Sequence, residues 1–303
     1  METSSSAGLF NQEDNNEKTE VGREETRVPE AGKKNSDPRK CVDVDVINLR
    51  NIRQVYKTGK GKSDFVLFDN LNLDIKDFEH TGQFISILGE SGCGKSTILR
   101  YISGLQQPTE GEILIYGKKK TDNITVPMVF QQYSSLPWKT VLDNIALPLQ
   151  MHGIPKEERY ERAYKIIKEV GLEGHEHKWA KYPLLSGGQL QRVAIARSLI
   201  ASPQILLMDE PFGALDISTR TGMQQLILDI YNSAHLDPTI IFITHDISEA
   251  VLLSNRIYIM KARPGRIDTI IDVDLPEERN ISMKKSAELN QYVNYIDNIM
   301  SKK

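Results

Sequence analysis

The chain has 303 residues and a formal charge of −3, which excludes the basic excess typical of proteins whose main partner is nucleic acid. Its two cysteines, Cys41 and Cys93, have neither disulfide-scaffold nor metal-ligand spacing, a pattern typical of a reducing cytosol. No apolar run approaches the roughly 20 residues that cross a bilayer, so any membrane role would require a partner.

Residues 1–41 form a polar segment that is rich in Glu, Ser, Asn and Lys. The segment has almost no periodic apolar residues, so burial cannot offset the entropy lost on ordering. We expect a disordered N-terminal tail, with docking to a partner as the alternative, and the lack of an apolar stretch argues against a signal peptide.

The first half of the folded part is predicted to be rich in strands. Alternation between apolar and polar residues indicates a strand at 42–46, and turns are expected at Gly59, Gly61 and Gly82. Further apolar runs predict strands at 65–68, 71–75, 84–88, 112–117 and 127–130.

The second half alternates helices with buried strands. Helices are predicted at 156–170, 191–199 and 224–231, and apolar strands at 204–208, 239–243 and 257–260. This alternation predicts an α/β fold with a largely parallel sheet covered on both faces. The early strands indicate an added antiparallel lobe, and residues 134–185 a mostly helical insert.

The segment GESGCGKST fits the pattern G-x-x-x-x-G-K-[ST] between a predicted strand and a predicted helix. Glycines allow the backbone N–H groups to point inward, and the helix N-terminus adds partial positive charge, so the loop suits a polyphosphate. Lys95 would reach the β- and γ-phosphates, and the Ser96 hydroxyl would bind Mg²⁺. The alternative is an ordinary Gly/Ser-rich turn. The candidate nucleotide-binding residues here are Gly89, Glu90, Ser91, Gly92, Cys93, Gly94, Lys95, Ser96 and Thr97.

Two carboxylates follow the buried strand at 204–208. Asp209 at the strand tip suits the Mg²⁺ shell, and Glu210 can polarise an attacking water. Without the phosphate loop, two solvated acids would be a sufficient interpretation.

The segment LSGGQ at residues 185–189, followed by Gln191 and Arg192, is too specific for coincidence. A Ser and two Gly ahead of a helix make a second site for anionic phosphate. With the phosphate loop, the sequence resembles the nucleotide-binding subunits of ABC transporters over about residues 44–270.

This resemblance implies a P-loop NTPase (RecA-like) core with an antiparallel β subdomain and a helical subdomain. The ABC ATPase domain would occupy residues 42–275, and a C-terminal helical tail residues 276–303. The resemblance also implies that the LSGGQ segment closes over the ATP held by the opposite subunit, through Ser186, Gly187, Gly188 and Gln189.

Other positions match the family's motifs one by one. Tyr56 is similar to the aromatic residue that stacks on adenine, although local packing would also explain it. Gln131, rather than its neighbour Gln132, is similar to the loop glutamine that contacts Mg²⁺ and senses the membrane partner. Asp216, in ALD, matches the loop that crosses the dimer interface, and His245 matches the switch histidine that contacts the γ-phosphate.

Two further features have more than one interpretation. His175 and His177 have near-ligand spacing, but no further Cys or His cluster accompanies them, which favours an exposed loop over a metal site. Trp138 would border the groove for a helix of the membrane subunit, or pack within the helical lobe.

The resemblance implies that ATP is hydrolysed with Mg²⁺ between two copies of the chain. It also implies that ATP binding closes the pair and that loss of phosphate opens it. The catalytic residues would be Lys95, Glu210 and His245, and the metal residues Ser96, Gln131 and Asp209. Implied partners are a second copy, separate transmembrane permease subunits and a periplasmic or extracellular substrate-binding protein, without nucleic acid. The expected location is peripheral, on the cytoplasmic side of the inner membrane.

Segments 134–144, 211–216 and 262–267 resemble the nitrate/sulfonate/taurine subgroup of importers, although thiamine-precursor and bicarbonate importers share much of them. A soluble ABC-type ATPase acting on DNA or ribosomes is the alternative. It fits less well, because fewer than a hundred residues separate Gly94 from Leu185 and one cassette is present. A nucleotide-binding module without catalysis would be expected to lack Glu210 or His245, and both are present.

Overall fold

The structure is a computed structural model that describes residues 42, 44–57, 63–78, 82–121, 124, 126–233, 238–276 and 278–301. The predicted tail at 1–41 lies outside the described residues, as do the turns expected at Gly59 and Gly61.

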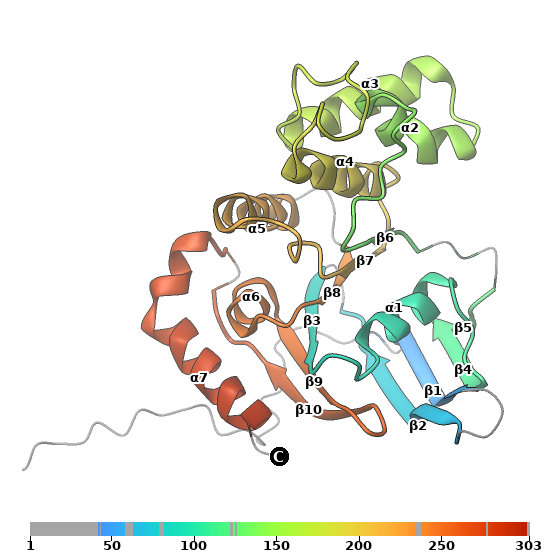
Figure 1. The fold of residues 1–303 in the computed structure, drawn as a ribbon, viewed down its shortest axis with the longest axis vertical. Coiled ribbons are helices and arrows are strands. Elements are labelled where there is room, and N and C mark those ends of the chain that lie inside the picture. Colours follow the sequence, from blue (N-terminus) through green and yellow to red (C-terminus); the bar gives the residue numbers. More distant parts are fainter. Residues whose placement is uncertain are drawn as a thin grey trace, which may run out of the picture. The chain divides into compact units, whose positions relative to one another are not determined.

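Among the described residues, the larger sheet has six strands in the order β10-β9-β3-β8-β7-β6 (Figure 1). Their bounds are Gln83–Gly89 for β3, Met128–Val129 for β6, Ile205–Asp209 for β7, Thr239–Ile243 for β8, Arg256–Lys261 for β9 and Arg266–Asp272 for β10. The strands from β9 to β6 pair in parallel, and β10 pairs antiparallel with β9. The segments that follow β3, β6, β7 and β8 therefore leave the sheet at one edge, where ligands bind in such folds.

A second sheet, within the same ranges, has four antiparallel strands in the order β2-β1-β4-β5. Their bounds are Ile47–Tyr56 for β1, Phe65–Ile75 for β2, Glu110–Ile115 for β4 and Lys118–Lys119 for β5. The strand predicted at 42–46 is wrong: β1 begins at Ile47, opposite Ile75, where its partner strand ends. The two strands predicted at 65–68 and 71–75 form one strand, because the polar residues between them make an irregularity in the ladder with Asn70 at φ +63° rather than a turn.

The core is divided by the larger sheet. In β3, Phe84 and Leu88 belong to one hydrophobic cluster, whereas Ile85 and Ile87 belong to another, as expected for side chains that alternate across a strand. The first cluster includes residues of α4, α5 and α6, and the second includes α1 and the antiparallel sheet. Both faces of the central strands are therefore covered, which explains their continuous apolar sequences.

The helices have the following bounds: α1 Lys95–Ser103, α2 Val141–Met151, α3 Lys156–Glu169, α4 Gly187–Leu199, α5 Ile217–Asn232, α6 Ile247–Leu253, the short 3₁₀ helix η1 Ile281–Lys285 and α7 Ala287–Ser301. The helix predicted from 224 begins seven residues earlier in the structure, at Ile217. Its first turns are polar and β-branched, and Asp216 caps them through its side chain. The C-terminal segment buries Leu289 and Ile296 in the same cluster as α6.

Candidate active site

The phosphate-loop segment leaves β3 at Gly89 and enters α1 at Lys95. Gly92 and Gly94 have φ angles of +80° and +105°, a conformation that other residues rarely adopt. A Cβ atom on Gly94 would lie 2.2 Å from Cζ of Phe68, so this position also excludes a side chain by contact. The loop is therefore held in a tight curve by its glycines and by the ring beside them.

Lys95 and Ser96 begin α1 and contact different parts of the site. Nζ of Lys95 donates to the carbonyl oxygens of Gly89 at 2.8 Å and of Glu90 at 3.0 Å, and the residue is only 7% exposed. The Ser96 hydroxyl donates to Oδ1 of Asp209 at 2.9 Å. The ammonium group thus lies over the loop, and the hydroxyl joins the loop to the end of β7.

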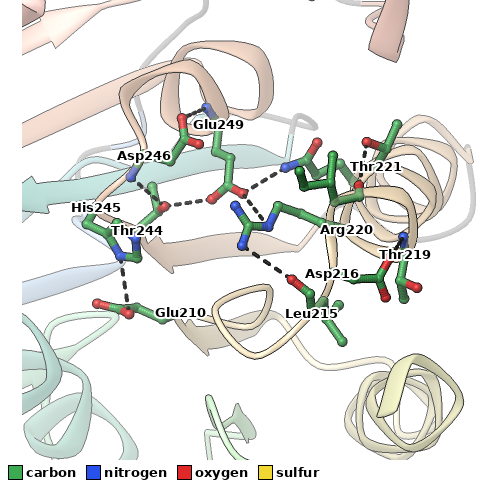
Figure 2. Close-up of polar contacts among 12 residues, drawn as sticks. Glu210, Leu215, Asp216, Thr219, Arg220, Thr221, Thr244, His245, Asp246 and Glu249 are labelled. Carbon is green, nitrogen blue, oxygen red and sulfur yellow. Dashed lines mark hydrogen bonds and ion pairs between the residues drawn. The ribbon is translucent and has the colours of Figure 1, made fainter. Parts of the chain in front are cut away.

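Glu210 is the first residue after β7, with φ +44°. Its backbone N–H donates to the carbonyl of Ile243 at the end of β8. Its Oε2 accepts from Nε2 of Gln131 at 3.3 Å and lies 3.4 Å from Nδ1 of His245, as Figure 2 shows for the histidine. The segments after β6, β7 and β8 therefore bring an amide, a carboxylate and an imidazole together.

Asp209 precedes this cluster at the end of β7. Burial raises the pKa of the Asp209 carboxyl, and the hydrogen bond from Ser96 opposes that rise. A partly buried carboxylate beside a serine hydroxyl is a pair of oxygen ligands of the kind that Mg²⁺ prefers.

The LSGGQ segment begins α4. Oγ of Ser186 accepts from the Gln189 N–H at 3.3 Å, and Oε1 of Gln189 accepts from the Ser186 N–H at 2.9 Å, which makes a complete capping box. A Cβ on Gly187 would lie 2.1 Å from the Tyr133 hydroxyl, and one on Gly188 would lie 2.4 Å from Cγ2 of Thr219. A side chain at either glycine would therefore require the neighbouring Tyr133 or Thr219 side chain to move.

In the ranges that the structure describes, no hydrogen bond or ion pair links residues 186–189 to residues 89–97. The structure brings together Lys95 and Ser96 with the residues at the strand ends, but it does not join the LSGGQ segment to them.

Two predicted residues lie at the ends of secondary-structure elements. Tyr56 ends β1, stacks on Phe65 with ring centroids 6.4 Å apart, and accepts a hydrogen bond from Gln106 at 3.1 Å. Asp216 caps α5, and hydrogen bonds from Thr219 and Ser218 hold the pKa of its carboxyl well below its usual range.

Comparisons with known proteins show the family to which this chain belongs. The family model for ABC transporters matches residues 68–213. An uncharacterized ABC transporter ATP-binding protein of Methanocaldococcus jannaschii is 47% identical over 234 residues, which cover 77% of this chain and 83% of that protein. The chain belongs to the ABC transporter ATP-binding proteins.

Two further relatives are informative. The nitrate import ATP-binding protein NrtD of Synechocystis sp. is 38% identical over 261 residues, which cover 84% of this chain and 94% of that protein. A dimeric structure of the ATP-binding cassette MJ0796, in a post-hydrolysis state with ADP and Pi, matches with a TM-score of 0.63 at 35% identity and covers 76% of this chain and 100% of that chain. The predicted P-loop NTPase fold and ATPase activity are thereby confirmed, and ATP is the nucleotide that this ABC ATPase binds.

Three residues near Glu210 were not predicted from the sequence: Thr244, Arg220 and Glu249. They line one small pocket together with Glu210 and His245. The signal that could have identified Glu249 is its position before the apolar run Ala250–Leu253, because a charged residue in such a run must be buried with partners.

The remaining candidates lie elsewhere. Nε2 of His175 contacts Nε2 of Gln189 at 2.9 Å, and no group of three potential metal-binding side chains occurs among the described residues. Trp138 is 67% exposed. No helix in the described ranges is long and apolar enough to cross a membrane.

Proposed function

We propose that two copies of this ABC ATPase bind Mg-ATP between them, close, hydrolyse it and reopen, and so drive separate transmembrane permease subunits. The observation that carries the proposal is the Glu210 carboxylate, which lies within 3.4 Å of both Gln131 and His245 at the edge where the phosphate loop begins.

The chemistry is an in-line attack of water on the γ-phosphorus, with ADP as the leaving group. Glu210 accepts the proton of the attacking water, and His245 donates to a γ-phosphate oxygen. Lys95 exchanges its two carbonyl contacts for the β- and γ-phosphates, where its charge and the loop N–H groups stabilise the transferring phosphoryl group. Tyr56 stacks on the adenine.

The residues present fit a magnesium ion. The Ser96 hydroxyl and the Asp209 carboxylate meet at 2.9 Å, and the Gln131 amide follows a neighbouring strand, so three oxygen-bearing side chains converge on this edge. A bound Mg²⁺ would neutralise charge on the phosphate oxygens.

The LSGGQ segment would complete the site of the other copy. Ser186 Oγ accepts a hydrogen bond within its own helix, which leaves its hydroxyl hydrogen for a phosphate oxygen of ATP bound to the partner. Asp216 and the following Ile217, which is 82% exposed, would lie at the interface between copies. The dimeric structure of a relative with ADP and Pi supports this arrangement. ATP contacts with both copies favour the closed pair, and loss of phosphate favours the open one.

Exposed apolar side chains on the helical segment support a membrane partner. Four of them lie between α2 and α4 or just before α2: Trp138, Trp179, Tyr182 and Leu184. Trp and Tyr are enriched where proteins bind one another, and we assign these side chains to the contact with a helix of the permease. The ATPase would then be peripheral, on the cytoplasmic side of the inner membrane.

The transport direction and cargo are inferred from resemblance. The segments around Trp138 and at 262–267, with the nitrate import relative, favour an importer of nitrate-, sulfonate- or taurine-like solutes that are delivered by a substrate-binding protein. No observation favours the alternative of a soluble ATPase that acts on nucleic acid or ribosomes.

Mixing two inactive variants tests the shared site. A Lys95→Ala chain has a damaged phosphate loop, and a Ser186→Arg chain has a damaged LSGGQ segment, so each alone should be inactive. In an equimolar mixture, half of the pairs are mixed and each has one intact site, which should restore about a quarter of the wild-type rate of ATP hydrolysis.

The matched control mixes Lys95→Ala with a chain carrying both substitutions. No pair in that mixture has an intact phosphate loop, so no activity should return. A first mixture no more active than its components would contradict the two-copy site.

A further inference from the structure

Glu249 is a buried residue that lines the same small pocket as the proposed catalytic residues Glu210 and His245. The residue is 4% exposed, and its two oxygens have different partners. Oε1 accepts from Nε2 of Gln224 on α5 at 2.8 Å, and Oε2 accepts from the Thr244 hydroxyl at 2.7 Å. Nε of Arg220 lies 3.9 Å from Oε1. One carboxylate therefore joins α6, α5 and the segment that leaves β8.

The contact with Thr244 reaches the histidine. Oγ1 of Thr244 donates to Glu249 and accepts from the Asp246 N–H at 3.0 Å, so the residues on both sides of His245 are fixed. Nδ1 of His245 then lies 3.4 Å from Oε2 of Glu210 (Figure 2). Two hydrogen bonds therefore connect Glu249 to the residues on either side of His245, and so to the backbone that carries the imidazole.

The contact with Arg220 reaches the other proposed interface segment. Nη2 of Arg220 donates to the carbonyl oxygen of Leu215 at 3.3 Å, immediately before Asp216, which caps α5 (Figure 2). The arginine spans the small pocket that Glu210, His245 and Glu249 also line. The guanidinium thus connects the buried carboxylate to the backbone of the segment that would meet the partner copy.

We propose that Glu249 is a positioning residue that couples the segment carrying His245 to the segment carrying Asp216, through Thr244 on one side and Arg220 on the other. The proposal rests on the proposed function, in which His245 contacts the γ-phosphate and Asp216 contacts the second copy. Contact of His245 with ATP would then change the contact of Asp216 with the partner, and the reverse would hold by the same factor, because the coupling of two sites is reciprocal.

Burial of the Glu249 carboxylate is less favourable than burial of an apolar side chain in the same space. Burying a charge requires several hydrogen bonds to offset its lost hydration, whereas an apolar side chain of similar volume would need none. Burial raises the pKa of the Glu249 carboxyl, while hydrogen bonds from Thr244 and Gln224 and the charge of Arg220 favour its ionised form. Packing alone therefore does not explain a carboxylate that is held by both segments.

A contact from the C-terminal segment fixes the orientation of Gln224. Nζ of Lys284 donates to Oε1 of Gln224 at 2.7 Å. Because an ammonium group can only donate, the amide oxygen must face Lys284 and the amide nitrogen must face Glu249. Thr244, Arg220 and the Lys284–Gln224 pair therefore all restrict the position of the Glu249 carboxylate.

The test measures ATP hydrolysis and nucleotide affinity by the full-length chain carrying Glu249→Gln, Arg220→Met or both. Each single variant should lower kcat at least about ten-fold and leave the affinity for a fluorescent ATP analogue within about two-fold, because the phosphate loop is untouched. The double variant should be no slower than the slower single variant, because both substitutions break the same link. Arg220→Lys should recover part of kcat.

Glu169→Gln, an exposed carboxylate on α3, is the matched control and should behave as the wild type. Losses of kcat that multiply in the double variant, or unchanged kcat with only a lower melting temperature, would overturn the proposal. Arg220 is one-third exposed, so Arg220→Met and Arg220→Lys decide the question if Glu249→Gln does not fold. A failure of the proposed function itself would give a different result: the His245→Ala chain would hydrolyse ATP at the wild-type rate.

Discussion

Phe68 determines the shape of the phosphate loop from outside it. The ring is fully buried and packs edge-to-face on Tyr101, with centroids 6.2 Å apart. Added Cβ atoms on Gly94 and Gly265 would lie 2.2 Å from its Cζ and 2.6 Å from its Cε1, respectively. An apolar ring on the antiparallel sheet therefore holds two backbone segments at contact distance.

Gly94→Ala should lower the free energy of unfolding of the nucleotide-free chain by about 2–4 kcal/mol, because it combines a left-handed φ with a steric clash. Urea unfolding would measure the change. Gly222→Ala on α5 is the control, since a Cβ there meets nothing within 4 Å. It should increase stability by about 0.4–1 kcal/mol. A Gly94→Ala chain as stable as the wild type would disprove this steric account.

Helix α6 depends on one arginine from the C-terminal segment. The helix has seven residues, and Arg279 Nη1 donates to the carbonyl oxygens of Val251 and Leu252 at 3.3 Å and of Ser254 at 2.6 Å. Burial lowers the pKa of Arg279 to about 10, so the guanidinium is charged at neutral pH and lies where the helix end is partially negative. A helix this short requires such tertiary support.

Arg279→Met should lower the free energy of unfolding by about 2–4 kcal/mol, because it leaves buried carbonyl groups without a donor. Arg50→Met is the comparison: Arg50 forms a 3.8 Å surface ion pair with Glu112, and its loss should change stability by less than about 1 kcal/mol. Thermal or urea unfolding would measure both, and equal effects of the two substitutions would contradict the capping role of Arg279.

The sequence predicts some elements better than others for physical reasons. The strands at 84–88, 204–208, 239–243 and 257–260 match β3, β7, β8 and β9 to within one residue at each end, because strands buried on both faces are continuously apolar. The prediction of a strand at 42–46 is wrong because a strand also needs a partner strand. The partner strand β2 ends at Ile75, opposite Ile47, so the ladder does not extend to residues 42–46. The start of α5 was missed because a side-chain cap, rather than an apolar pattern, begins the helix at Asp216.

Some residues of the site could likewise be predicted from the sequence, and others depend on how the whole chain folds. Gly94, Lys95 and Ser96 could be found because phosphate binding requires fixed residue types at fixed spacing. Glu249 and Arg220 could not, because their roles follow from a contact between α5 and α6 that no local motif specifies. Their proximity to His245 depends on the sheet order that places β7 beside β8.

If two copies of the chain enclose ATP together, the Glu210→Gln chain should form a stable pair whose mass can be measured in solution. This variant keeps the size of the side chain but cannot accept the proton of water, so ATP should remain bound between the copies. With Mg-ATP, light scattering after gel filtration should give twice the chain mass of 34.3 kDa, and with ADP the single mass. A chain that stays monomeric in saturating Mg-ATP, alone and beside its membrane partner, would show that two copies do not enclose ATP.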